Sequence, residues 1–227
     1  MKPLLFAVSF CCLVAAESKG EDWPHWRGPL LDGIGQAKTL PDEWSETKNL
    51  LWKTPLPAAG SSTPIVMRGS ILFTLEHKSE VLLLCFGEDG KERWRRKVCD
   101  SKGKGNGEKT NASPSPVSDG QRVIVMTGTG EGVAFSLGGK ETWRFNAQDR
   151  YGKFRLGFGF HVTPVLHEGR LYLQLIHAGA ALLACVSPET GKGIWKVDRK
   201  SDGVAECLHS YASPTAHRHG EVNVVIT

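Results

Sequence analysis

Gly139-Lys140-Glu141-Thr142-Trp143 is the middle copy of a G-K-x-x-W motif that decides the fold of this chain. The motif recurs at intervals of roughly fifty residues, and its other copies are Gly90-Lys91-Glu92-Arg93-Trp94 and Gly191-Lys192-Gly193-Ile194-Trp195. A Ser/Thr-Pro pair keeps the same step, at Thr63-Pro64, Ser115-Pro116, Thr163-Pro164 and Ser213-Pro214. A turn glycine follows each pair, at Gly69, Gly120, Gly169 and Gly220. Three markers that share one period of this length predict the blades of a β-propeller.

The third repeat shows how one blade is built. Residues 162–166 form a short strand, and the apolar side chains of residues 170–176 alternate between two faces. Residues 181–186 are nearly all apolar, which is typical of a strand covered on both faces. A glycine turn then leads into an outer strand at 194–197. The sequence therefore predicts an all-β protein, a β-propeller of four-stranded blades.

The tryptophan of each motif copy falls in the predicted outer strand. We expect Trp94, Trp143 and Trp195 to occupy equivalent positions and to pack between neighbouring sheets, where a large aromatic ring buries the most area. The lysine of the motif is expected to be a solvated turn residue.

The repeats do not add up to a closed ring. Propellers usually close with about four to eight blades, whereas this chain supplies three full blades and the first two strands of a fourth. Residues 51–54 resemble an outer strand placed ahead of the first blade. We expect the chain to be a fragment of a longer protein, with closure by self-association as the alternative. When the chain is expressed as given, we expect it to self-associate, because no proline or lysine protects the edge of the strand at 222–226.

The chain divides into three segments. Residues 1–16 have a short basic start, an apolar run and small residues at their end, which together predict a signal peptide. The apolar run is too short to span a bilayer. Residues 17–60 form a tryptophan-rich lead-in that ends in the outer-strand strap, and residues 61–227 form the partial propeller. We expect a periplasmic or extracellular protein with no membrane span; the alternative is lipid attachment at Cys11 or Cys12.

Charge and cysteine content narrow the classes of function. The chain has 28 basic and 24 acidic residues, a balance too even to predict nucleic-acid binding. Cys85 and Cys185 hold similar places in non-adjacent repeats, too far apart for a disulfide, and are expected to be small buried residues. Cys99 and Cys207 fall between repeats, and whether they pair stays open.

The repeats resemble the pyrroloquinoline-quinone-type (PQQ-like) propeller repeat, whose outer turn and strand read A-x-T-G-K-x-x-W. The nearest copy is Pro188-Glu189-Thr190-Gly191-Lys192-Gly193-Ile194-Trp195. A further resemblance, to a subfamily of exported propellers abundant in planctomycete-type bacteria, rests on Asp22-Trp23-Pro24-His25-Trp26-Arg27-Gly28-Pro29, Leu40-Pro41, Trp44 and Asn49-Leu50-Leu51-Trp52-Lys53-Thr54-Pro55-Leu56-Pro57. The resemblance covers residues 22–227 and implies the fold more strongly than any activity.

Two branches of that superfamily imply different functions. Quinoprotein dehydrogenases hold the quinone with a vicinal disulfide and a stacking tryptophan, beside a Ca²⁺ site that includes an aspartate base. The vicinal pair here, Cys11-Cys12, lies in the predicted signal peptide. The other branch includes the lipoprotein scaffold of the outer-membrane β-barrel assembly machinery, which has no active site.

The resemblance therefore favours an exported, non-catalytic scaffold that binds a protein or polysaccharide partner, with no catalytic residue, cofactor or metal. The alternatives are a PQQ-dependent dehydrogenase, which requires PQQ and calcium, and a hydrolase or lyase.

The connections between blades predict where a ligand binds. Residues 99–112, 148–160 and 200–210 are longer than structural joins need, and all emerge on one face. We expect a funnel on this face for an anionic or hydroxyl-rich ligand; the alternative is that its residues cap strands and bind channel water. The candidate residues are Ser61, Ser113, Arg155, His161, His209 and Tyr211.

Overall fold

The computed structural model describes residues 20–58, 60–101 and 110–227. The predicted signal peptide at 1–16 and the vicinal pair Cys11-Cys12 lie outside the described residues.

The described residues form three four-stranded antiparallel sheets and a two-stranded hairpin, each built from strands consecutive in sequence. Blade 1 contains β1 (Ile65–Met67), β2 (Ser70–His77), β3 (Glu80–Gly87) and β4 (Glu92–Asp100). Blade 2 contains β5 (Val117–Ser118), β6 (Arg122–Met126), β7 (Glu131–Ser136) and β8 (Glu141–Asn146). Blade 3 contains β9 (Val165–His167), β10 (Arg170–His177), β11 (Ala180–Val186) and β12 (Gly193–Asp198). The half blade is the hairpin of β13 (Thr215–His219) and β14 (Val222–Ile226).

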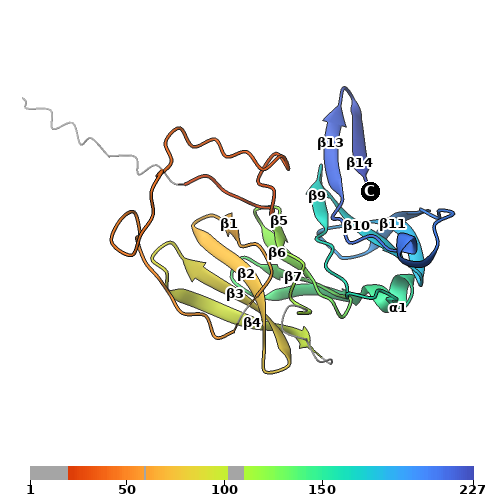
Figure 1. The fold of residues 1–227 in the computed structure, drawn as a ribbon, viewed down its shortest axis with the longest axis horizontal. Coiled ribbons are helices and arrows are strands. Elements are labelled where there is room, and N and C mark those ends of the chain that lie inside the picture. Colours follow the sequence, from red (N-terminus) through yellow and green to blue (C-terminus); the bar gives the residue numbers. More distant parts are fainter. Residues whose placement is uncertain (1–19, 59, 102–109) are drawn as a thin grey trace, which may run out of the picture.

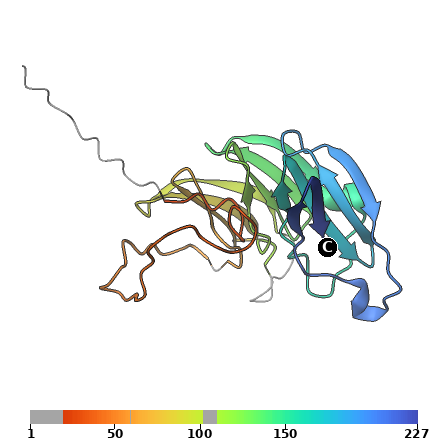
Figure 2. The ribbon, with the colours of Figure 1, turned by 90° about the horizontal axis from the view of Figure 1, so that it is seen from above.

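The sheets stand side by side in chain order (Figures 1 and 2), and the innermost strands β1, β5, β9 and β13 contact one another in turn. The predicted fold, an all-β propeller with three full blades and half of a fourth, is confirmed. Two short helices interrupt the connections between blades, α1 (Ala147–Tyr151) and the 3₁₀ turn η1 (Ala205–Leu208). The innermost strand of blade 3 begins at Val165, three residues later than the sequence indicates. The Thr163 N–H and the Pro164 carbonyl bond to the side chains of Ser213 and His25 instead of to a neighbouring strand.

The core lies between the sheets and follows the two-residue period of the strands. On β6, Val123 and Val125 belong to the cluster shared with blade 1, whereas Ile124 and Met126 belong to the cluster shared with blade 3. Blade 2 lies between blades 1 and 3, and blade 3 lies between blade 2 and the hairpin, so both faces of these two sheets contact a neighbour, which explains the continuous apolar runs of their third strands. Cys85 and Cys185 are fully buried in this core, as predicted.

The three motif tryptophans are equivalent in register. Trp94 pairs with Cys85, Trp143 with Ala134 and Trp195 with Cys185. In each sheet a β-bulge follows this pair by one residue. The predicted equivalence of the outer-strand tryptophans is therefore confirmed.

A contact between blades explains why glycine and tryptophan occur together in the motif. The Trp143 indole N–H donates to the Pro188 carbonyl of blade 3 at 2.8 Å, and a Cβ on Gly191 would lie 2.7 Å from the Trp143 ring. Gly191 also has φ of +68°, in the left-handed region that favours glycine. The motif glycine of one blade thus makes room for the motif tryptophan of the blade before it.

The same contact occurs twice more. The Trp94 indole donates to Leu137 O at 3.2 Å and lies over Gly139. Trp52, in the predicted outer-strand strap, donates to Glu88 O at 2.6 Å and lies over Gly90. Residues 51–54 pair with no strand among the described residues, yet the Trp52 indole occupies the place of an outer-strand tryptophan.

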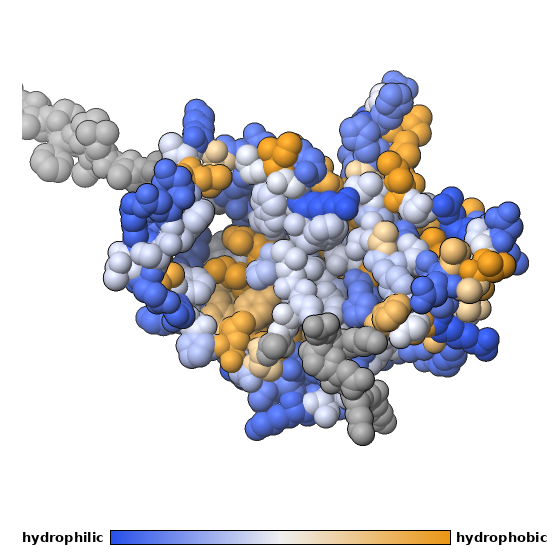
Figure 3. All heavy atoms as spheres, in the orientation of Figure 1, coloured by the Kyte–Doolittle hydropathy of each residue, from blue (hydrophilic) through white to orange (hydrophobic). Residues whose placement is uncertain are grey.

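The prediction that all three motif tryptophans are core residues is confirmed for Trp143 alone: Trp94 is half-buried, and Trp195 is exposed. Its side chain is 45% exposed, against 8% for Trp143. The physical reason is that no following glycine turn covers its ring within the described part of the chain. The hairpin that stands beside this blade also exposes apolar side chains, visible along one side of β13 and β14 (Figure 3): Val222, Val224 and Ile226.

A second set of contacts joins the blades at their inner ends and explains the Ser/Thr-Pro marker. Each backbone N–H of the marker donates to the marker hydroxyl of the next blade. The bonds are Thr63 N to Ser115 Oγ at 2.8 Å, Ser115 N to Thr163 Oγ1 at 2.9 Å, and Thr163 N to Ser213 Oγ at 2.9 Å. The marker residues thus form a chain of hydrogen bonds from blade to blade at the inner ends of the sheets, which we call the hydroxyl ladder.

The lead-in lies against the innermost strands of three blades. Trp23 exchanges two backbone hydrogen bonds with Val66 of blade 1, at 2.7 and 2.9 Å. The Pro24 carbonyl accepts from Ser118 N of blade 2 at 2.9 Å. The next residue, His25, is buried and bonds through Nε2 to the Pro164 carbonyl of blade 3 at 3.1 Å. Consecutive lead-in residues therefore contact consecutive blades.

The tautomer and charge of His25 follow from these contacts. Nδ1 accepts from Arg27 N at 3.2 Å, so Nε2 carries the proton that is donated to Pro164. Burial lowers the pKa of His25 from 6.5 to about 4, since the charged imidazolium is poorly solvated there.

Replacing Trp143 by alanine is expected to lower the free energy of unfolding by about 3–5 kcal/mol, because it empties a large buried aromatic site. The same change at the equivalent but half-exposed Trp195 is expected to cost about 1 kcal/mol, and Lys140→Ala less than about 0.5 kcal/mol. Denaturant midpoints of the three variants measure this. Equal losses for the two tryptophan variants would contradict the contact described for Trp143.

The protein is expected to lose stability as pH falls through the titration of His25. The folded state holds this ring neutral down to about pH 4, whereas the unfolded chain binds the proton near 6.5. Between pH 7 and pH 4 the contribution of His25 to the free energy of unfolding should fall by about 3 kcal/mol.

His25→Gln provides the matched control, because glutamine keeps a donor for the Pro164 carbonyl but does not titrate. The stability difference between wild type and this variant, measured by denaturant unfolding, should shift by that amount between the two pH values. A difference independent of pH would show that His25 is not buried against blade 3.

Candidate functional site

The predicted site residues lie in the connections on one face of the propeller, which we call the loop face. Because the strands alternate in direction, this face carries residues 110–116, 147–164 and 199–214 of the connections between blades, together with the turns that join the second and third strands of each full blade. Helix α1 lies on it and the tip of the β13–β14 hairpin lies on the opposite face (Figure 1).

Three of the six predicted funnel residues come together on the loop face around Phe158. The Phe158 N–H donates to Tyr211 Oη at 3.4 Å, and His161 Nε2 donates to the Phe158 carbonyl at 2.5 Å. The Phe158 and Tyr211 rings meet edge to face at 5.8 Å, and His209 meets Tyr211 at 6.4 Å. We call Phe158, His161, His209 and Tyr211 the aromatic cluster.

The other three predicted residues do not take part in these contacts. Ser113 donates its hydroxyl to Thr110 O at 2.8 Å and so closes a local turn, which fits the alternative that such residues cap strands. Ser61 and Arg155 are exposed. Phe158 itself is not among the predicted residues, because a single aromatic residue in a loop has no periodic partner; its flanking glycines, Gly157 and Gly159, are the one local signal.

A cleft of about 810 Å³ opens beside the aromatic cluster, between blades 1 and 2. One wall comes from the end of β4 and from the turn between β6 and β7; the other comes from residues 154–160 of the connection to blade 3. We call it the interblade cleft. Its lining includes Lys97, Asn111, Thr129, Glu131, Arg144 and Leu156.

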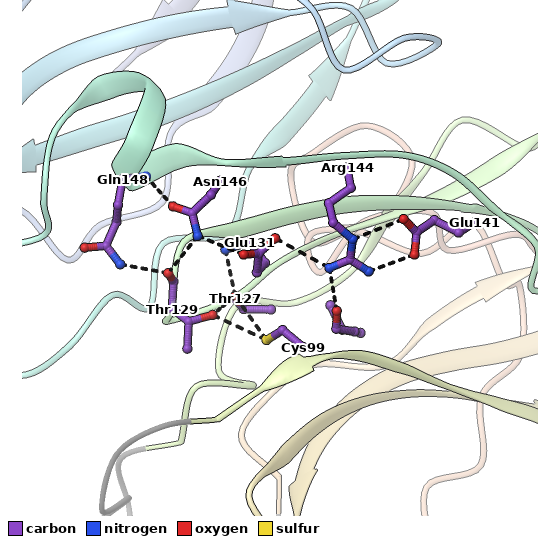
Figure 4. A network of polar contacts seen from close by, with 9 residues as sticks. Cys99, Thr127, Thr129, Glu131, Glu141, Arg144, Asn146 and Gln148 are labelled. Carbon is purple, nitrogen blue, oxygen red and sulfur yellow. Dashed lines mark hydrogen bonds and ion pairs between the residues drawn. The ribbon is translucent and has the colours of Figure 1, made fainter.

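Arg144 holds the polar wall of the interblade cleft in place (Figure 4). Its guanidinium donates to both carboxylate oxygens of Glu141, at 3.1 and 2.7 Å, and to the Val98 carbonyl of blade 1 at 2.7 Å. Glu131 Oε2 lies 3.5 Å from the same group. Hydrogen bonding to Glu141 is the main reason that the pKa of Arg144 is raised. The side chain is therefore a fixed cation that links two blades.

Asparagine and glutamine extend this network toward α1. Asn146 Nδ2 donates to Glu131 Oε1 at 2.9 Å, and Asn146 Oδ1 accepts from Gln148 N at 2.8 Å (Figure 4). Gln148 Nε2 donates to Thr129 O at 2.7 Å, and its Oε1 accepts from Phe154 N at 3.0 Å. The polar wall and the loop wall are thus tied to each other.

Cys99 lies at the base of this wall. Its thiol contacts Thr129 Oγ1 at 3.3 Å, and burial raises the thiol pKa. A raised pKa keeps the sulfur protonated, so Cys99 has no nucleophilic thiolate near neutral pH.

The open question of a Cys99–Cys207 disulfide is resolved in favour of free thiols. Cys99 belongs to strand β4 rather than to a loop between repeats, and Cys207 is exposed in η1.

The described residues do not form a site that fits a quinone cofactor with its calcium ion. Their four cysteines, Cys85, Cys99, Cys185 and Cys207, include no adjacent pair. Within residues 20–58, 60–101 and 110–227, no three His, Cys, Asp or Glu side chains gather closely enough to hold a metal ion. In the same residues, no helix has the length and apolar character needed to cross a membrane.

Comparisons with known proteins agree with this architecture. Residues 43–143 match the family model described as outer membrane protein assembly factor BamB. The prediction of a PQQ-like propeller repeat is therefore confirmed. A search of curated proteins finds no match.

Solved structures that resemble part of the chain include a quinohemoprotein alcohol dehydrogenase and a BamB protein. Quinohemoprotein alcohol dehydrogenase from Comamonas testosteroni matches with 18% identity and a TM-score of 0.49, over 62% of this chain and 21% of that one. BamB from Moraxella catarrhalis matches with 8% identity and a TM-score of 0.43, over 66% and 38% of the respective chains. The chain therefore spans well under half of the length of each of these structures, and at such identities the likeness does not extend to activity.

Thiol labelling is expected to distinguish the cysteines of a chain that begins at residue 17. Cys207 should react first with a thiol reagent because it is exposed, and Cys99 at least about tenfold more slowly. Cys85 and Cys185 should react only after unfolding. Mass spectrometry of the labelled protein over time measures the order, and Cys207→Ser should remove the fast phase. A fast phase that persists in this variant would contradict the burial of Cys99.

Proposed function

We propose that the protein is an exported, non-catalytic β-propeller that acts as a binding scaffold for a protein or polysaccharide partner. Of these two classes, the aromatic cluster favours a protein. Export rests on the predicted signal peptide at residues 1–16, and a periplasmic or extracellular location follows from it. Membership of the planctomycete-type subfamily, suggested by residues 22–29 and 49–57, belongs to the same proposal.

The observation that carries the proposal is the presentation of Phe158. The side chain is 49% exposed on the loop face, yet its backbone is held on both sides, by Tyr211 at the N–H and by His161 at the carbonyl. An exposed aromatic side chain on a restrained backbone loses little conformational entropy on binding, and such residues commonly anchor protein interfaces.

Nearby apolar groups extend this surface. Val204 is 74% exposed and Leu208 is 38% exposed, and both lie in the connection that also carries His209 and Tyr211. Together with Phe158 they place apolar side chains on two adjacent connections of the loop face, which fits a partner with an apolar binding segment.

The polar groups next to the cluster support a non-catalytic function. Arg144 and Glu131 are both committed to contacts within the protein, and the Cys99 thiol is held protonated by burial. A nucleophile or general base would need a pKa tuned toward neutrality and a partner that activates it. The Cys99 thiol has no such activation, because burial raises its pKa.

Site-specific photocrosslinking tests this proposal. Phe158→benzoylphenylalanine is expected to give a discrete crosslinked product after irradiation of intact cells that export the protein. His219→benzoylphenylalanine is the matched control, because His219 is exposed on β13 at the opposite face.

Products that are the same at both positions, or none at position 158, would contradict a partner site on the loop face. The dehydrogenase alternative has its own readout: purified protein incubated with PQQ and Ca²⁺ should show no quinone absorbance after gel filtration. Retention of the quinone together with alcohol-dependent dye reduction would favour that alternative instead.

A further inference from the structure

We propose that the interblade cleft is a second binding site, specific for a neutral, polyhydroxylated ligand of saccharide chemistry. This site is separate from the aromatic cluster, and the inference does not depend on the proposed protein partner. Its volume of about 810 Å³ falls within the range of small-molecule sites.

The two walls of the cleft differ in chemistry. Phe154, Leu156 and Phe160 form an apolar wall, in which the two phenylalanine rings stack at 4.6 Å. The facing wall is polar and includes Asn111, Thr129 and Glu131. A sugar ring has the same division, with C–H groups on its faces and hydroxyl groups around its edge, so it can satisfy both walls at once.

The charges that line the cleft cancel and are already paired. Lys97 Nζ lies between Asp100 at 2.7 Å and Glu80 at 2.8 Å, and these two carboxylates raise its pKa. Arg144 donates to both carboxylate oxygens of Glu141 and to the Val98 carbonyl. A charged ligand would have to compete with these partners. The pairing therefore favours an uncharged ligand.

Hydrogen-bonding capacity nonetheless remains on the polar wall. The Glu131 carboxylate, which has about four lone-pair positions, receives a hydrogen bond of 2.9 Å from Asn146 and a long contact from Arg144. The Asn111 amide uses its Nδ2 on Ser101 Oγ at 2.7 Å, and the Thr129 hydroxyl shares a hydrogen bond with Thr127 at 2.8 Å. The remaining capacity is rich in acceptors, which suits the many hydroxyl donors of a sugar.

The cleft is also restrained, which lowers the entropic cost of binding. Its polar wall is fixed by the contact of Arg144 with blade 1, and its apolar wall by the bond from Phe154 N to Gln148 Oε1. Leu156 packs against the core between blades 2 and 3. The walls are therefore part of the propeller body and do not need to fold around the ligand.

Isothermal titration of the full chain with neutral trisaccharides of glucose, mannose, galactose and N-acetylglucosamine tests the inference. At least one is expected to bind with a Kd below about 1 mM. Trigalacturonic acid and trialanine serve as the charged and peptide comparators and are expected to bind at least about tenfold more weakly.

Two variants locate the site. Glu131→Gln removes a strong acceptor, and Leu156→Trp fills the space beside the apolar wall; each is expected to weaken trisaccharide binding at least about tenfold. The matched controls are Glu189→Gln, in an exposed turn of blade 3, and Leu40→Trp, in the exposed part of the lead-in. Both should leave the Kd within about twofold of wild type.

Circular dichroism melting of each variant separates loss of binding from loss of fold, and the two cleft variants change different walls so that one suffices if the other unfolds. Absence of binding for all four trisaccharides at about 10 mM would overturn the inference. Binding that is unaffected in folded cleft variants would overturn it as well, and so would tighter binding of the uronate or the peptide.

Discussion

The contact between the tryptophan of one blade and the glycine of the next is the constraint on which this structure depends. Trp143 donates its indole N–H to the Pro188 carbonyl of the next blade, and Gly191 in the same turn leaves the space that the ring occupies. At the inner ends of the blades, the hydroxyl ladder adds a second contact, in which the backbone N–H of one blade always donates to the hydroxyl of the next. Between blades 1 and 2 and between blades 2 and 3, these two contacts set the position and tilt of the sheets, and the apolar side chains between them then pack in register. The packing of the core thus depends on the distance between sheets that the tryptophan–glycine contact and the hydroxyl ladder set.

Much of this architecture can be predicted from the sequence because repetition makes it visible. The period of G-K-x-x-W identifies the blade, and the alternation of residues 170–176 identifies its second strand. The coupling between glycine and tryptophan cannot be found in this way, since the two partners lie in different repeats and only the fold brings them together. Exposure of Trp195 is missed for the same reason, as its sequence context matches that of Trp143. The candidate sites are harder still: Phe158 has no counterpart in the other blades, and the pairing of Glu131 with Asn146 and Arg144 depends on register rather than on spacing.

The loop face combines two kinds of surface that call for different ligands. The aromatic cluster presents an apolar side chain outward on a restrained backbone, whereas the interblade cleft faces inward and pairs an apolar wall with acceptor-rich groups. Both include residues of the connections between blades, and binding residues commonly lie on such loops, which a rigid scaffold holds in place. The repeat can therefore remain constant while the connections between outer and inner strands vary, and function can change without a change in the packing of the sheets.

The lead-in has a consequence for the order of events during biosynthesis. His25 emerges early from the ribosome, but the carbonyl that it binds belongs to Pro164, 139 residues later. Contacts of such long sequence separation form late, because loop closure must precede them. Trp23 and Pro24 can dock on blades 1 and 2 as these form, whereas His25 gains its native partner only when the chain has reached blade 3. Docking of His25 would therefore mark the point at which the third blade is complete.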